Sequence, residues 1–111
     1  MPVKNPDEPF TRLTAQEAKE KIDRGEAQFV DVREPHEYTG GHAVGTQLIP
    51  LNSVMSRINE IAADRDVVFI CQKGQRSALA AEYAAAGGRT RLFNLEGGTD
   101  AWQAAGYPME K

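Results

Sequence analysis

The feature that most constrains this chain is the apolar run DVVFIC at residues 66–71, followed by a short glycine-containing loop and an alanine-rich segment. The run is apolar after its first residue and rich in β-branched side chains, which is typical of a central parallel strand buried on both faces. The only cysteine of the chain, Cys71, ends this run. Functional sites of parallel sheets form beyond the carboxyl ends of the strands. The sequence therefore places its one thiol where such a sheet would carry a site.

Strand-like and helix-like segments alternate along the whole chain. Strands are expected at 10–13, 28–32, 47–50, 66–71 and 91–95. Helices are expected at 14–23, where Thr14 and Glu17 have the spacing of a capping box, at 53–64, 77–86 and 100–105, and in one turn beginning at Pro35. This alternation predicts an α/β fold in three layers, with a central, mostly parallel sheet of about five strands and helices on both faces.

The length of 111 residues predicts one domain. Residues 1–9 carry three prolines and no apolar periodicity, so we expect a flexible N-terminal leader there. Residues 10–111 then form the single domain, which is long enough to bury a hydrophobic core.

The composition excludes several classes of protein. A net charge of −3 without a basic stripe gives no reason to expect nucleic acid as a partner. No apolar run approaches the ~20 residues that span a bilayer, so no membrane is expected either. The two histidines and the one cysteine lie far apart, so we expect no metal and no other cofactor. A free thiol and an N-terminus without an apolar stretch favour the cytoplasm.

The loop that follows Cys71 has the composition of an anion site. Gly74 allows a tight turn whose backbone N–H groups point into one concavity, and a helix beginning near Arg76 or Ser77 adds its positive end. Lys73 and Arg76 add two positive charges to this loop. A thiol in this position is expected to ionise readily, and the thiolate is the reactive form. The alternative interpretation of Cys71 is a small buried core residue.

The other loop residues allow two interpretations each. A cation in a first helical turn opposes the helix dipole, so Arg76 is interpreted as an anion ligand rather than as a surface charge. Lys73 fits a solvated loop residue equally well. Gln72 and Gln75 are expected to contribute backbone N–H groups more than side chains. Ser77 is expected to cap the helix, with a hydroxyl contact to the sulfur as the alternative.

Three motifs together resemble the single-domain rhodaneses, a family of sulfurtransferases. They are DVREPHEYTGGHAVGTQLIPL at 31–51, CQKGQRS at 71–77 and LEGGTDAW at 95–102. The resemblance extends over almost the full length, from FTRLTAQEA to AWQAAGYP. It implies the rhodanese-like version of the three-layer fold.

The resemblance also implies a two-step reaction. The Cys71 thiolate takes the outer sulfur of a donor anion such as thiosulfate, which the basic loop favours, and holds it as a persulfide. The catalytic residue would be Cys71, and the substrate would be bound by Arg33 and the loop residues Gln72, Lys73, Gly74, Gln75, Arg76 and Ser77. Since the chain has no second thiol, the acceptor must come from outside: cyanide, or a cellular thiol such as thioredoxin, glutathione or a sulfur-accepting protein.

Four residues outside the loop are given structural roles. Asp31 and Arg33, at the end of a strand, are expected to form a buried ion pair, and the alternative for Arg33 is a place at the mouth of the site. His42 is expected to fix its loop through a hydrogen bond to the backbone rather than to act as a base. Trp102 is expected in the core.

Two other functions stay open. Phosphatases of the same fold, and arsenate reductases of that type, also use a cysteine loop closed by arginine, but the phosphatase loop has five residues between Cys and Arg. Here there are four, residues 72–75, which leaves less room for a phosphoryl group. The second alternative is a persulfide relay or partner-recognition module without significant turnover of small molecules.

Overall fold

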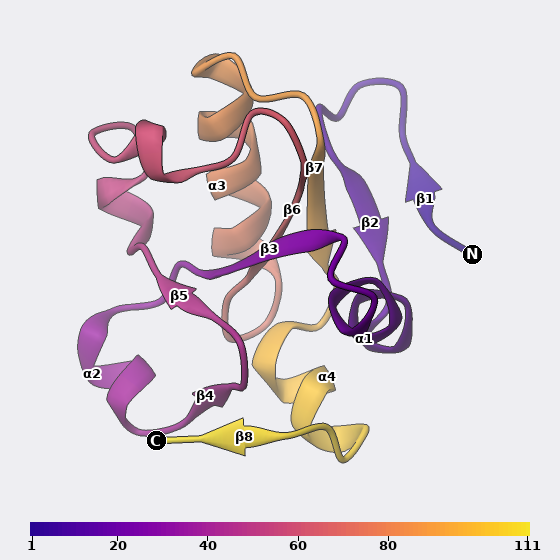
Figure 1. Ribbon diagram of the computed structural model, residues 1–111, viewed down its shortest axis with the longest axis vertical. Coiled ribbons are helices and arrows are strands. Elements are labelled where there is room, and N and C mark those ends of the chain that lie inside the picture. Colours follow the sequence, from indigo (N-terminus) through magenta and orange to yellow (C-terminus); the bar gives the residue numbers. More distant parts are fainter.

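The protein is described by a computed structural model that covers residues 1–111. Its centre is a six-stranded sheet in the order β1-β2-β7-β6-β3-β5 (Figure 1). The strands are β1 (Val3–Lys4), β2 (Thr11–Leu13), β3 (Ala27–Asp31), β5 (Gln47–Leu48), β6 (Asp66–Ile70) and β7 (Leu92–Leu95). All neighbours are parallel except β1 and β2. The predicted α/β class is confirmed, with six strands instead of about five.

Helices cover both faces of this sheet. They are α1 (Ala15–Asp23) and α4 (Gly98–Ala104) on one face and α3 (Gln75–Ala86) on the other, while the short α2 (Pro35–Thr39) buries no residue and belongs to neither core. One core cluster joins α3 to Val67 and Phe69 of β6, and the other joins α1 and α4 to Val68 and Ile70 of the same strand. Alternate residues of β6 thus serve opposite cores, which explains why its sequence is apolar without a break.

The start of α1 follows the predicted capping box. The amide of Glu17 donates to Thr14 Oγ1 at 3.1 Å, and the amide of Thr14 donates to Glu17 Oε1 at 2.8 Å. Each side chain satisfies an amide that the first helical turn leaves without a partner. Ala18 of this helix is fully buried, and Ile22 packs against the second core, as expected.

The predicted helix at 53–64 is wrong. The segment holds two short 3₁₀ turns, η1 (Leu51–Ser53) and η2 (Ile58–Glu60), although its apolar side chains still pack on the first core. Its backbone has partners from distant parts of the chain: Arg89 donates to the carbonyls of Ile58 and Ile61 at 2.8 and 2.9 Å, and the amide of Ala62 donates to Gln28 at 2.8 Å. The amides of the segment bond mainly to carbonyls three residues earlier, as in 3₁₀ turns, while the long-range hydrogen bonds take up Ile58 O and Ala62 N, which would pair with each other in an α-helix.

Residues 1–9, expected as a loose leader, include one short strand. Val3 and Lys4 pair antiparallel with Arg12 and Thr11 of β2. They occupy an edge of the sheet that would otherwise leave backbone groups unpaired. The flexibility of this segment stays a prediction.

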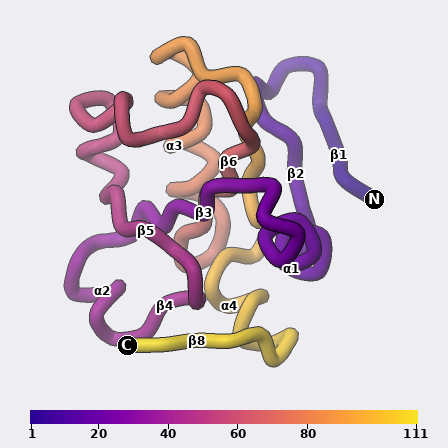
Figure 2. Tube along the Cα trace, viewed as in Figure 1, coloured from indigo at the N-terminus to yellow at the C-terminus, as the bar shows by residue number.

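A second, two-stranded sheet lies at the end of the molecule that holds Cys71. β4 (His42–Ala43) pairs antiparallel with β8 (Met109–Glu110), which brings the C-terminal end of the chain beside α2 (Figure 2). None of the helices is long and apolar enough to cross a membrane.

Candidate active site

Cys71 comes directly after β6, which lies between β3 and β7 in the sheet. Its Sγ accepts a hydrogen bond from the amide of Gly74 at 3.1 Å and lies 3.3 Å from Ser77 Oγ. The residue is 1% exposed. The thiol is therefore enclosed by its own loop, with one main-chain amide and one hydroxyl directed at the sulfur.

Gly74 gives the loop its shape. Its φ of +111° is a conformation that side chains rarely adopt, and an added Cβ would lie 3.2 Å from the amide nitrogen of Gly97. The next residue, Gln75, begins α3 two positions earlier than predicted. Ser77 thus lies inside the first helical turn, so its predicted capping role is wrong, and its hydroxyl makes the alternative contact with the sulfur instead.

The GGT turn (residues 97–99), which begins α4, and the next residue bond to the backbone carbonyls of the cysteine loop. The amide and the hydroxyl of Thr99 both donate to the carbonyl of Cys71, at 2.8 and 3.1 Å, and the amide of Asp100 donates to the carbonyl of Gln72 at 3.2 Å. Gly98, with φ +58°, lets the two backbones approach, because a Cβ there would lie 2.4 Å from Cys71 O. Sequence reasoning missed this role, although the GGT turn was visible as a motif.

Asn94 is a second supporting residue that sequence reasoning missed. It lies on β7, is 1% exposed, and donates from Nδ2 to the carbonyl of Gly74 at 3.2 Å and to Glu96 at 2.6 Å. Its Oδ1 has no hydrogen-bond partner. A polar side chain within an apolar strand was the available signal, since buried polar groups are normally kept for a hydrogen bond.

Both cations of the loop have carboxylate partners. The guanidinium of Arg76 makes two short contacts with Glu37, at 2.7 and 2.9 Å, and these hydrogen bonds lower the pKa of Glu37 to about 2 against the opposing effect of burial. Lys73 is 71% exposed and lies 3.3 Å from Asp100. The pair of free positive charges expected beside the thiol is therefore absent. The positive end of α3 and the Gly74 amide remain to stabilise negative charge there.

Arg33 connects the first motif to the cysteine loop. It is 3% exposed and pairs with Asp31 at 2.9 Å, which confirms the expected buried ion pair. Its Nη1 also donates to Gln72 Oε1 at 3.1 Å, and Nη2 donates to the carbonyl of Gly41 at 2.8 Å. Gln72 in turn donates to Asp100 at 2.5 Å. Its side chain therefore makes two hydrogen bonds, where the sequence predicted a contribution mainly from the backbone N–H group. The predicted site residue Gln75 is exposed and makes no side-chain hydrogen bond.

A polar cleft beside the loop is lined by residues of α2 and α4. Its volume is about 310 Å³, and its lining is Arg33, His36, Glu37, Gly40, Gly41, Gln72, Thr99, Gln103 and Met109. The lining includes Gln72, the residue after the cysteine, but not Cys71 itself. No group of three or more His, Cys, Asp and Glu side chains is placed to hold a metal ion.

A family model described as Rhodanese-like domain matches residues 14–105. The chain belongs to this family. GlpE of Pseudomonas paraeruginosa, named as a thiosulfate sulfurtransferase, is 33% identical over 91% of this rhodanese-like domain and 90% of its own length. YqhL of Bacillus subtilis, an uncharacterized protein, is 45% identical over 68% of the chain, and the matched part is 60% of YqhL.

A solved structure has the same architecture. The crystal structure of a rhodanese-related protein from Thermoplasma volcanium superposes on the rhodanese-like domain with a TM-score of 0.80 at 29% identity, and the match covers 89% of this chain and 96% of that one. This similarity supports the sheet order and the helical layers described above.

Two further residues of the rhodanese-like domain have the structural roles expected from the sequence. His42 Nδ1 donates to the carbonyl of Tyr38 at 2.8 Å, and its ring stacks on Tyr38 with centroids 3.6 Å apart. Trp102 is 1% exposed, packs on Phe29, and donates from Nε1 to the carbonyl of Pro108 at 2.8 Å. His42 thus ties α2 to β4, and Trp102 ties α4 to the segment that precedes β8.

Proposed function

We propose that this rhodanese-like domain is a sulfurtransferase that carries sulfane sulfur from thiosulfate to a thiol or cyanide through a persulfide on Cys71. The observation that carries the proposal is the Gly74 amide at 3.1 Å from Cys71 Sγ, at the start of a twelve-residue helix. A main-chain donor and a helix start are suited to stabilise negative charge on sulfur. The relative GlpE, which is named as a thiosulfate sulfurtransferase, supports thiosulfate as the donor.

In the first step, the Cys71 thiolate attacks the outer sulfur of thiosulfate. A sulfur–sulfur bond to Sγ forms, the bond between the outer sulfur and the sulfonate sulfur breaks, and sulfite leaves with its electron pair. The Ser77 hydroxyl, 3.3 Å from Sγ, and the Gly74 amide hold the sulfur in position for this attack. Because Lys73 and Arg76 are paired, main-chain groups carry more of the anion binding than free side-chain charges do.

In the second step, an external nucleophile removes the sulfur. Cyanide or a thiolate attacks the outer sulfur of the persulfide, and the electron pair of the broken bond returns to Cys71. The chain holds no other cysteine, so no internal thiol can take the sulfur. Thioredoxin, glutathione or a sulfur-accepting protein would serve as the cellular acceptor.

The decisive experiment is to weigh the intact protein after incubation with thiosulfate. We expect a gain of one sulfur atom, its loss on addition of cyanide with formation of thiocyanate, and no gain in the Cys71→Ala variant. A wild-type protein that stays unmodified would refute the proposal, and so would a Cys71→Ala variant that gains the same mass.

A persulfide relay to one protein partner would use the same first step. It predicts slow turnover with cyanide and with small thiols, and rapid transfer to that partner. Comparing the two rates on the same loaded protein separates the relay from the enzyme. A phosphatase receives no support from the loop, since Arg76, which would bind the phosphoryl group, is held by Glu37.

A further inference from the structure

Asn94 is the one residue with a buried side-chain oxygen or nitrogen that has no hydrogen-bond partner. It is 1% exposed, and the atom without a partner is Oδ1. Its Nδ2 donates to two acceptors, the carbonyl of Gly74 at 3.2 Å and Glu96 Oε2 at 2.6 Å. Turning the carboxamide over would set its oxygen against both acceptors, so the donor has to face Gly74. Because a buried oxygen without a partner costs folding free energy, this orientation points to a role other than stability.

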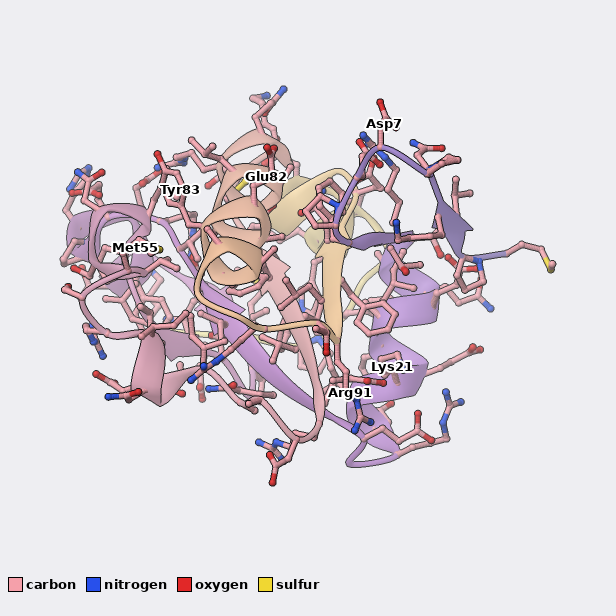
Figure 3. The ribbon with its side chains drawn as sticks, turned by 90° about the horizontal axis from the view of Figure 1, so that it is seen from above. Asp7, Lys21, Met55, Glu82, Tyr83 and Arg91 are labelled. Atoms are coloured by element: carbon pink, nitrogen blue, oxygen red, sulfur yellow. The ribbon has the colours of Figure 1, made fainter.

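The sheet places Asn94 beneath the start of α3. Leu92 of β7 packs in the core cluster that contains residues of α3. Side chains two positions apart in a strand share a face, so Asn94 lies on the same side as Leu92. The other side of α3, which carries the exposed Glu82, is turned away from the sheet (Figure 3). Asn94 thus reaches Gly74, the residue just before the helix, from within the protein.

The hydrogen bond to Gly74 fixes one peptide unit of the cysteine loop. The carbonyl of Gly74 accepts from Asn94 at 3.2 Å and from the amide of Ala78 at 3.4 Å. No peptide bond of the chain is cis, so the N–H of Gln75, in the same planar unit, points the opposite way from that carbonyl. This direction leads out of the N-terminal end of α3. Asn94 therefore sets the direction of an amide that it does not touch.

The amide of Gln75 is next to the amide that holds the sulfur, and it is free. Gly74 has a left-handed conformation, with φ +111° and ψ −7°, and Gln75 begins the right-handed helix. Successive residues of opposite hand direct their amides into one concavity that suits an anion. The Gly74 amide donates to Cys71 Sγ at 3.1 Å, whereas the Gln75 amide has no acceptor within the chain. It is available to a negatively charged ligand beside the sulfur.

We propose that Asn94 is a positioning residue, which holds the carbonyl of Gly74 so that the free amide of Gln75 donates to an oxygen of the anionic sulfur donor. This role rests on the proposed function, in which the anion is thiosulfate. The carboxamide is itself held in place from β2, because the second oxygen of Glu96 accepts from Arg12 Nη1 at 2.7 Å. The donor of Asn94 thus has one fixed direction.

The test measures the binding of sulfate, a dianion that resembles thiosulfate but has no outer sulfur to give. Iodoacetamide, a neutral reagent, alkylates Cys71, and sulfate bound in the loop should slow this alkylation. The sulfate concentration that gives half protection is the dissociation constant. In the wild type we expect saturable protection by sulfate.

Two variants remove the donor of Asn94 in different ways. Asn94→Leu keeps the size of the side chain, and Asn94→Ala leaves a cavity. Both should raise the dissociation constant for sulfate by the same factor, about five- to tenfold, while alkylation without sulfate stays within about twofold of the wild type. The second-order rate of sulfur uptake from thiosulfate should fall by the same factor as sulfate binding.

Urea unfolding separates positioning from simple support of the fold. Asn94→Ala should be less stable than Asn94→Leu, because the cavity adds to the loss. The positioning role is overturned if sulfate binding weakens in step with stability, if it is unchanged in both variants, or if unprotected alkylation slows as much as binding weakens. A wild type that sulfate does not protect overturns it as well.

The matched control is Asn59→Leu, the same substitution at an exposed position of η2. This turn is bonded by Arg89, which follows the C-terminal end of α3, and so lies at the far end of that helix from the cysteine loop. Asn59→Leu should leave sulfate binding and alkylation unchanged. Failure of the proposed function is seen separately, because thiosulfate then adds no sulfur to Cys71, whereas the sulfate measurements involve no sulfur transfer.

Discussion

The guanidinium of Arg76 and the carboxylate of Glu37 form an ion pair through two hydrogen bonds, Nη1–Oε1 at 2.7 Å and Nη2–Oε2 at 2.9 Å. The pair ties the first turn of α3 to α2. Arg76 was the residue that the sequence assigned to an anionic donor. In the folded protein, the carboxylate of Glu37 accepts hydrogen bonds from both terminal nitrogens of Arg76. Glu37 therefore reduces the positive charge that a donor meets.

The first prediction is that Glu37→Gln binds thiosulfate more tightly. Removing the carboxylate charge exposes the full charge of Arg76, and a partly exposed pair of this kind is worth at most about 1 kcal/mol, so the KM for thiosulfate should fall about two- to fivefold. Steady-state kinetics at saturating cyanide measure it, with Glu82→Gln on the α3 surface as the control. A higher KM in Glu37→Gln would show that Glu37 positions Arg76 as a ligand instead.

The second prediction concerns acid stability. The pKa of Glu37 is lowered to about 2, so the ion pair stabilises the folded state fully above the unfolded value near 4.5 and loses that effect as the pH falls toward 2. Urea unfolding should show the wild type more stable than Glu37→Gln at pH 6, by about 1 kcal/mol after solvent screening. The difference should shrink steadily between pH 4.5 and 2. A difference that does not depend on pH would contradict the ion pair.

The sequence predicted those parts of the fold that depend on local patterns. The capping box of Thr14 and Glu17 and the apolar run of β6 each contain their own signal within a few residues, and both were confirmed. The segment at 53–64 also had a helical pattern of apolar residues. Its backbone is instead bonded by Arg89 and Gln28, about thirty residues away in either direction, which no local pattern reveals.

The sequence likewise predicted only those parts of the candidate site that depend on neighbouring residues. The sequence identified the cysteine loop, because a strand end, a glycine and a helix start are adjacent in the chain. It did not identify what each loop residue touches: Arg76 meets Glu37 from 39 positions away, and the carbonyl of Cys71 is held by Thr99 from 28 positions away. Those partners come from α2 and α4, which only the folded chain brings to the loop.

The third prediction tests the support of the loop by the GGT turn. Gly98→Ala should destabilise the protein by about 2–4 kcal/mol and slow sulfur uptake, because its Cβ would lie 2.4 Å from the carbonyl oxygen of Cys71 at a φ of +58°. Gly106→Ala is the matched control, since Gly106 also has a positive φ, +77°, but no atom within 4 Å of an added Cβ. It should cost only about 1 kcal/mol and leave sulfur uptake unchanged. Equal effects of the two variants on uptake would argue against a role for the turn.

The fourth prediction isolates the hydroxyl beside the sulfur. Ser77 is fully buried, and its Oγ lies 3.3 Å from Cys71 Sγ. Ser77→Ala removes this hydrogen bond to the attacking thiolate while keeping a small residue that favours the helix, so stability should change by less than about 1 kcal/mol. Hydrogen bonds to charged groups are worth about 1.5–3 kcal/mol, which corresponds to a loss of about tenfold or more in the second-order rate of sulfur uptake from thiosulfate. The rate is measured by stopping the reaction at intervals and weighing the intact protein. Ser56→Ala is the control, since Ser56 is exposed. An unchanged rate in Ser77→Ala would mean that the Gly74 amide and the helix start hold the thiolate without the hydroxyl.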